Sequence, residues 1–169
     1  QAGWLDPGFG QNGLVTTAVT PYTNGIYGMV IQPDGKIVAA GFANMNIPQS
    51  YNFDFALARY MPDGSLDATF GNGGKVTTDF GSNRDYGQNV ALMPDGRIVV
   101  VGYMFDGNSD NYAVARYLPN GTLDNSFSGD GKATVDFAGL DDDAFGIVIQ
   151  PDGKVIIGGI AYTGAHSDF

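Results

Sequence analysis

The chain repeats itself with a period of about 60 residues, and this repeat constrains its fold more than any other feature. The motif Leu-Asp-x-x-Phe begins at Leu5, Leu66 and Leu123, so its copies lie 61 and 57 residues apart. The turn motif Pro-Asp-Gly begins at Pro33 and returns with the same two separations. Two motifs with one spacing define true copies of a structural unit. The single domain 1–169 therefore divides into three repeats, at about 5–65, 66–122 and 123–169.

Each repeat is predicted to form a small antiparallel sheet. The middle copy contains four expected strands, at 75–80, 87–93, 97–105 and 111–118. Pro-Asp-Gly favours a hairpin because Pro presets φ, Asp bonds to its own backbone, and Gly accepts a positive φ. The third strand is apolar on consecutive residues at 98–101, so it needs cover on both faces. Four-stranded units with this period and this cover predict an all-β fold made of about three β-propeller blades.

Composition supports strands and turns and excludes two kinds of partner. All 18 acidic residues are Asp, which favours turns, and there are 26 Gly, so we expect almost no helix. The net charge of −10 opposes binding to nucleic acid. No apolar stretch approaches the roughly 18 residues of a membrane-spanning helix. Without Cys there is no disulfide or thiolate metal site, and we predict no cofactor.

Three motifs resemble a known family: the Leu-Asp-x-x-Phe opening, the turn Pro-Asp-Gly-Lys-Ile-Val, and the segment Phe-Ala-Leu-Ala-Arg-Tyr at 55–60 with its echo at 112–117. Over essentially its whole length the chain resembles the delta-sixty repeats of large secreted bacterial proteins. The resemblance implies propeller blades in a secreted or cell-surface protein, and it implies no catalytic residues. Because repeat sequence begins almost at Gln1, we expect that a signal peptide has been removed.

The third repeat stops before its fourth strand, so the chain supplies fewer than three blades, whereas a closed propeller needs at least four. An open blade face that exposes about five large apolar side chains forgoes on the order of 10 kcal/mol of burial. We therefore expect a partial propeller that is completed by further blades of the same or another chain. One such completion is a homodimer in which two copies form a six-bladed ring.

Comparing the copies separates scaffold from candidate site. Most Asp residues recur between copies and are explained by turns, whereas variation concentrates in the loops at the sheet edge opposite the Pro-Asp-Gly turns. We predict that this edge binds a protein or a glycan, although relaxed selection on exposed loops explains the same variation. The candidate binding residues are Tyr51, Phe105, Asp106, Asn108, Asp110, Tyr162 and His166.

Three groups of acidic or polar residues could in principle form a metal site or a catalytic site. Residues 106–110 alternate oxygen ligands like the start of a calcium loop, but Asn111 stands where such a loop needs Gly, so we favour a plain turn. The Asp run at 141–143 offers ligands for a divalent cation, but we favour a solvated acidic loop. His166, Ser167 and Asp168 are sequence neighbours, which does not produce the geometry of a hydrolase triad. We therefore predict no catalytic and no metal-binding residues.

Arg59 and Arg116 recur at one blade position among apolar neighbours, and we expect both to be paired or stacked within the scaffold. The favoured function is a non-enzymatic binding or structural module of a secreted or surface protein. Two alternatives stay open. One is a propeller enzyme of the lactonase or lyase type, for which one His and no Glu is a thin inventory. The other is an assembly segment that pairs through open blade faces.

Overall fold

The computed structural model describes residues 4–45, 52–81, 83–164 and 166–168, and all regular structure in these residues is β-strand. The strands form three antiparallel sheets, as the predicted all-β blades require. The first sheet contains β1 (Asn24–Ile31), β2 (Ile37–Asn44), β3 (Phe53–Tyr60) and β4 (Lys75–Thr78). The second contains β5 (Asp85–Leu92), β6 (Ile98–Phe105), β7 (Asp110–Tyr117) and β8 (Lys132–Val135). The third contains β9 (Asp142–Ile149), β10 (Val155–Tyr162) and β11 (Ser167–Asp168). No helix in the described part of the chain is long and apolar enough to cross a membrane.

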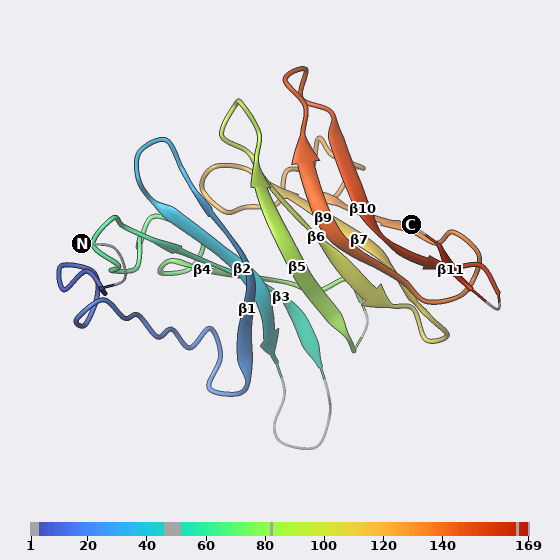
Figure 1. Ribbon diagram of the computed structural model, residues 1–169, viewed down its shortest axis with the longest axis horizontal. Coiled ribbons are helices and arrows are strands. Elements are labelled where there is room, and N and C mark those ends of the chain that lie inside the picture. Colours follow the sequence, from blue (N-terminus) through green and yellow to red (C-terminus); the bar gives the residue numbers. More distant parts are fainter. Residues whose placement is uncertain (1–3, 46–51, 82, 165, 169) are drawn as a thin grey trace.

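The Pro-Asp-Gly segments form the predicted hairpins. In the second sheet, Gly96 has φ 84° and donates its N–H to the carbonyl of Met93, while Asp95 accepts the N–H of Arg97. Gly35 and Gly153 have φ 82° and 84° in the equivalent turns. Only glycine adopts this conformation without strain. All three hairpins project from one end of the sheets, at the top of Figure 1.

One strand assignment was wrong. Residues 75–80 were expected to open the second blade, but β4 pairs with β3 and closes the first sheet, just as β8 pairs with β7. The Leu-Asp-x-x-Phe segment turns the chain back along the strand that precedes it. The backbone N–H of Asp67 donates to the carbonyl of Arg59, and the backbone N–H of Arg59 donates to the carbonyl of Gly74. The alternation of polar and apolar side chains predicts where a strand lies, but it does not predict which neighbouring strand it pairs with. Each sequence repeat therefore contributes strands to two sheets.

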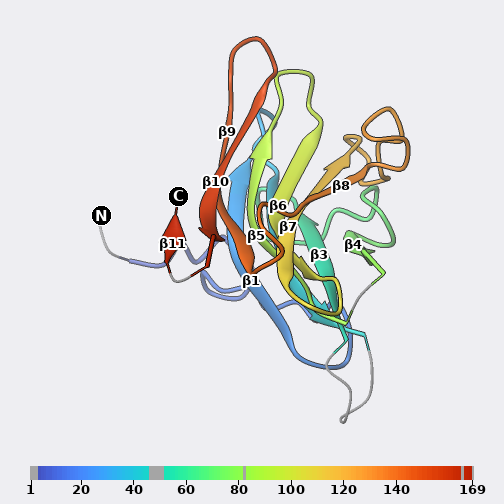
Figure 2. The same cartoon turned by 90° about the vertical axis from the view of Figure 1, so that its right-hand side faces the viewer.

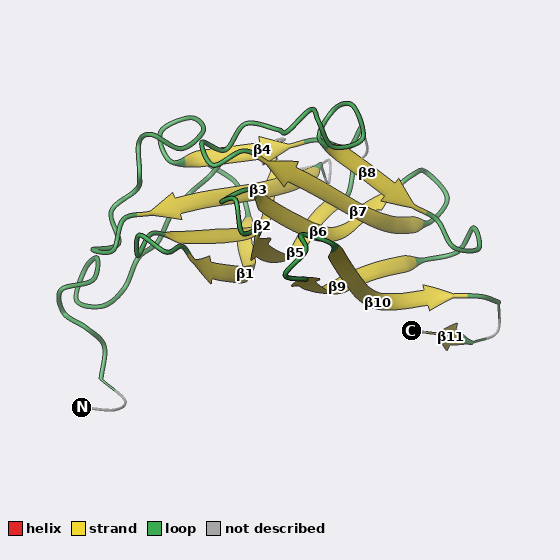
Figure 3. Cartoon of the chain, turned by 90° about the horizontal axis from the view of Figure 1, so that it is seen from above, coloured by secondary structure: helices red, strands yellow, loops and turns green. Residues whose placement is uncertain are grey.

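The three sheets stack face to face. Strand β5 packs against β1, β2 and β3, and β9 packs against β5, β6 and β7. In Figure 3 the first strands β1, β5 and β9 lie on one side of the molecule, while β4 and β8 lie on the other; Figure 2 shows the same separation. The neighbours Val99 and Val100 point to opposite faces and are 1% and 0% exposed. Cover on both faces, which the apolar run in β6 predicted, is confirmed.

The outer faces of the two end sheets stay open in this chain. Met29 and Ile31 on β1 are 68% and 70% exposed, and Ile156 on β10 is 50% exposed. The residue equivalent to Ile156 in the middle sheet is the fully buried Val99. A groove of about 460 Å³ runs along the open face of the first sheet. The difference in burial therefore comes from the absence of a covering sheet and not from the side chains themselves.

Candidate functional site

Loops from successive repeats meet at the sheet edge opposite the Pro-Asp-Gly hairpins. We call this surface the loop edge; it comprises residues 20–24, 43–45, 81, 83–84, 104–110, 138–141, 161–164 and 166. In each repeat a backbone hydrogen bond of 2.8–3.1 Å joins the last residue of the second strand of a sheet to the segment that leads into its first strand. The donor and acceptor residues are Asn44 and Thr23, Phe105 and Arg84, and Tyr162 and Asp141. The predicted gathering of these loops at one edge is confirmed.

Arg84 is the centre of the best-defined group on the loop edge. Its Nη2 lies 2.9 Å from Asp110 Oδ1, and its guanidinium carbon lies 4.3 Å from the ring centroid of Phe105. The backbone N–H of Asp110 donates to Asp141 Oδ1 at 3.0 Å, which links the second sheet to the third. Burial raises the pKa of Asp110, and the positive charge of Arg84 opposes that rise. A cation, an aromatic face and two carboxylates are thus held together near solvent.

Four of the predicted binding residues lie together where β6 meets β7: Phe105 ends β6, Asp106 and Asn108 lie on the loop, and Asp110 begins β7. Asp106 Oδ1 accepts the backbone N–H groups of Asn108 and Ser109, at 2.8 and 3.0 Å. These bonds lower the pKa of Asp106. Since Asp106 closes the turn and Asp110 pairs with Arg84, the geometry favours a structural loop over a calcium loop at 106–110.

The remaining predicted residues lie apart from that group. Tyr162 and His166 are exposed on the hairpin between β10 and β11, and Tyr51 lies outside the described residues. Asp168 Oδ2 accepts the hydroxyl of Thr163 at 2.6 Å, which gives this carboxylate a structural role.

The expectation of a solvated loop at 141–143 was wrong for two of its three residues. Asp142 is fully buried and its Oδ2 accepts the N–H of Phe137 at 2.8 Å. Asp143 is half-buried, and burial together with the charges of Asp110 and Asp141 raises its pKa to about 6. Three successive charges looked like a solvated run, but the strand β9 begins at Asp142 and draws them against the sheet.

A row of five aromatic rings borders the loop edge at the first junction between sheets. Neighbouring centroids lie 5.0–5.5 Å apart. The rings belong to Tyr27, Phe42, Phe53, Tyr86 and Tyr103. Phe53 is 8% exposed whereas Tyr27 is 54% exposed, so the row runs from core to surface. Gly25 was the sequence feature that could have indicated this packing. Any larger residue there would place its Cβ 2.5 Å from the Phe42 ring, so glycine makes room for the ring.

Three carboxylates also converge at this first junction. One oxygen from each of Asp54, Asp79 and Asp85 lies within 4.8 Å of the other two. Asp54 and Asp85 are buried, at 5% and 0% exposure, while Asp79 is exposed. Burial, then the charges of Asp79 and Asp85, raise the pKa of Asp54 to about 7. Sequence comparison had explained all three residues as turn formers, so this group was missed.

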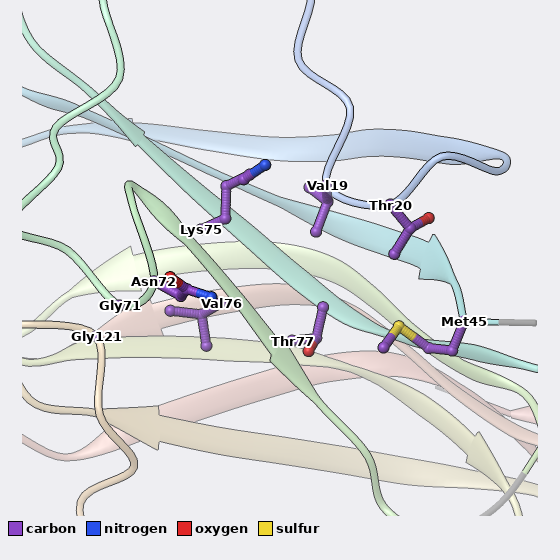
Figure 4. Close-up of a pocket in the computed structure, with 9 residues that line it drawn as sticks. All are labelled: Val19, Thr20, Met45, Gly71, Asn72, Lys75, Val76, Thr77 and Gly121. Carbon is purple, nitrogen blue, oxygen red and sulfur yellow. The ribbon is translucent and has the colours of Figure 1, made fainter.

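A cavity of about 390 Å³ lies between β4 and the N-terminal segment and has a structural origin. Figure 4 shows Lys75 directed from β4 towards the segment that carries Val19 and Thr20. Lys75 donates to the backbone of that segment as the equivalent Lys132 donates to the residue after β4. At the first junction between sheets the Phe80 ring lies beneath the Lys132 ammonium, whereas the smaller Val19 stands at the equivalent position beside Lys75. The smaller Val19 side chain therefore leaves part of this space unfilled.

The recurring arginines belong to the scaffold, as predicted. Arg59 Nε lies 2.9 Å from Asp67 Oδ2, its guanidinium lies 4.5 Å from the Phe70 centroid, and its Nη1 donates to the carbonyl of Pro119 in the next repeat. Arg116 repeats the ion pair with Asp124 at 2.8 Å. The hydroxyl of Thr69 and the charge of Arg59 are among the causes that lower the pKa of Asp67.

Repeated four-stranded meanders that stack face to face define this chain as a set of β-propeller blades. A family described as a β-propeller domain of unknown function (DUF5122) matches residues 32–70, 94–127 and 150–168, which together exceed half of the chain. The chain belongs to this β-propeller family. No curated protein matches it.

Proposed function

We propose that this chain is a non-enzymatic binding module that presents its loop edge to a protein or a carbohydrate. The observation that carries the proposal is the group formed by Arg84, Phe105 and Asp110. None of the three recurs in the other repeats, yet the backbone hydrogen bond between Phe105 and Arg84 is repeated, and Asp110 pairs with Phe105 across the two strands. An ion pair and a cation–π contact join their side chains. Loops that vary on a fixed scaffold are the usual place for recognition.

The chemistry of the loop edge suits a polar ligand with a flat face. The aromatic row supplies ring faces, and Tyr27 offers one of them to solvent. Arg84 and Asp110 supply a charged donor and acceptors within the same edge. Sugars and peptides both use such pairings of stacking and hydrogen bonding, since amphipathic aromatic side chains provide contact area and the charged groups fix orientation.

The test is a binding screen of the intact chain against arrayed glycans and peptides, followed by variants. Arg84→Ala and Tyr27→Ala should each reduce affinity for a captured ligand at least tenfold. Lys154→Ala is the matched control, because Lys154 pairs with Asp152 in a Pro-Asp-Gly turn at the opposite edge. Equal loss in all three variants, or capture that none of them alters, would contradict binding through the loop edge.

A second candidate function is assembly through the open blade faces, and the exposed Met29, Ile31 and Ile156 favour it. Within the chain, each sheet face equivalent to these is covered by the next sheet. A second copy, or further blades, would bury them in the same way. Light scattering during size exclusion tests this idea: a mass near twice 17.8 kDa supports pairing of two copies, and Ile156→Asp should then return the chain to a monomer. A monomer at all concentrations contradicts self-assembly.

We further infer that the repeats are of the delta-sixty kind and that the protein is secreted by, or displayed on, a bacterium. The repeated motifs support this inference. Recovery of the protein from the cytoplasmic fraction of its native cells, and from no other fraction, would contradict it.

The proposal assigns no catalysis to this chain. A lactonase or lyase would hydrolyse or cleave lactone, ester or uronate substrates, with turnover that a chelator abolishes if a metal is required. We expect no turnover with these substrates in the presence of a panel of divalent metals. Metal-dependent turnover would favour the enzyme instead.

A further inference from the structure

The carboxylates of Asp54, Asp79 and Asp85 come together because three elements meet at the first junction between sheets. Asp54 lies on β3 beside Phe55, which pairs with Thr78 of β4, so Asp54 and Asp79 extend the same strand pairing. Asp85 begins β5, the first strand of the next sheet. One oxygen from each lies within 4.8 Å of the others. The exposed Asp79 connects this group to solvent.

Asp54 is the residue that the fold alone leaves unexplained. Its side chain is 5% exposed, and within the described part of the chain its Oδ1 has no hydrogen-bond partner. A buried carboxylate is costly unless a cation or hydrogen-bond donors compensate it. The charges that surround Asp54 are themselves negative, since Asp79 and Asp85 are its neighbours. The Lys132 ammonium approaches from β8, but it donates to the backbone carbonyl of Asp79.

The second junction shows that the turn does not need this third carboxylate. Its equivalent residues are Asn111, Asp136 and Asp142. Asp142 accepts the N–H of Phe137 at 2.8 Å, as Asp85 accepts that of Phe80 at 2.7 Å. Asp136 caps its turn through Ala138, as Asp79 does through Gly81.

The two junctions differ in one of the three residues: β3 carries Asp54, whereas β7 carries Asn111. The Oδ1 of Asn111 is likewise buried without a partner among the described residues, but a neutral amide costs far less to bury than a carboxylate. An asparagine therefore fulfils the structural role at this position, and the extra charge of Asp54 calls for a different explanation.

We propose that Asp54, Asp79 and Asp85 bind a hard divalent cation at the first junction between sheets. Each of the three carboxylates brings one oxygen atom to this group, and oxygen is the ligand that Ca²⁺ and Mg²⁺ prefer. Ca²⁺ fits better, because it accepts irregular coordination by mono- or bidentate carboxylates, whereas Mg²⁺ demands a near-ideal octahedron and retains water. The bound ion neutralises the charge of Asp54 and ties the first sheet to the second beside the aromatic row.

The experiment is calorimetric titration of the chelator-treated chain with Ca²⁺ and, separately, with Mg²⁺, together with thermal unfolding in each metal. Wild type should bind one ion per chain with a dissociation constant below about 1 mM, the weak end of the range for extracellular sites. Its Tm should rise with the ion. Binding of Mg²⁺ in preference to Ca²⁺ would support the site and change the favoured ion.

Asp79→Asn and Asp136→Asn form the matched pair, because both residues cap equivalent exposed turns. Asp79→Asn should weaken binding at least tenfold, and Asp136→Asn should leave it unchanged. Asp54→Asn should also lose the ion and still fold, because Asn111 occupies the same place in the next repeat. Absence of both heat and a Tm shift in wild type, or equal weakening in the two turn variants, would overturn the proposal.

Discussion

The two junctions between sheets share one scaffold and differ in the chemistry that they carry. Each has an arginine paired with the Asp of Leu-Asp-x-x-Phe, and each has an Asp that accepts a backbone N–H at the start of the next sheet. The first junction adds Asp54 and the aromatic ring of Tyr86, where the second has Asn111 and Asp143. The comparison teaches that shared residues build the blade, while unshared ones at the loop edge determine what it can bind.

The largest expected effect is on the shared core. Phe55→Ala should lower the free energy of unfolding by about 3–5 kcal/mol, because Phe55 is 0% exposed between the first two sheets and its loss leaves a cavity. Chemical denaturation measures this change. Ile156→Ala, on the open face of the third sheet, should cost less than about 1.5 kcal/mol. Similar losses in both variants would mean that the end sheet is covered after all.

A smaller effect is expected at the scaffold arginines. Arg59→Met should cost about 3 kcal/mol, since its side chain is 7% exposed and its loss leaves the buried Asp67 without its closest cation. Arg116→Met should cost less, because Arg116 is 17% exposed and its pair with Asp124 is nearer to water. A second cation is present at both sites, with Lys36 3.2 Å from Asp67 and Arg97 3.0 Å from Asp124, so it does not distinguish them. Denaturant midpoints of the two variants give the comparison. A larger loss for Arg116→Met would refute the ranking.

The three-carboxylate group should make stability depend on pH in the absence of metal. The pKa of Asp54 is about 7 in the folded chain and about 4 when unfolded, so the folded state holds the proton more tightly. Its contribution is complete below about pH 4 and is lost as the pH rises to about 7. Asp54→Asn should therefore reduce this decline by on the order of 4 kcal/mol.

The decline should not vanish in Asp54→Asn, because the pKa of Asp143 is also raised, to about 6. Denaturation in chelator from pH 4 to pH 8 provides the measurement. An identical pH profile for wild type and variant would show that Asp54 is charged and compensated in the ion-free chain.

The smallest effect on stability is expected at Arg84. Its side chain is 44% exposed, and an exposed ion pair contributes less than about 1 kcal/mol. Arg84→Ala should therefore leave the denaturation midpoint almost unchanged while it removes ligand binding at the loop edge. A loss of several kcal/mol would place Arg84 in the scaffold and not in the site.

Much of the fold was predictable from sequence because the repeat displays it three times. The Pro-Asp-Gly hairpins, the buried apolar strands β2 and β6, and the gathering of variable loops at one edge follow from turn chemistry and hydrophobic patterning. The pairing of β4 with β3 did not follow, because strand patterns carry no partner information. The convergence of Asp54, Asp79 and Asp85 was also hidden, since each residue had a sufficient local explanation as a turn former.

The most direct test is to move the difference between the junctions. Asn111→Asp gives the second junction the same three carboxylates as the first, beside Asp136 and Asp142. Calorimetric stoichiometry with Ca²⁺ should rise from one ion per chain to two, and Asp54→Asn combined with Asn111→Asp should return it to one. A stoichiometry that stays at one in the single variant would contradict the account, because the repeated scaffold would then not be sufficient to turn one added carboxylate into a site.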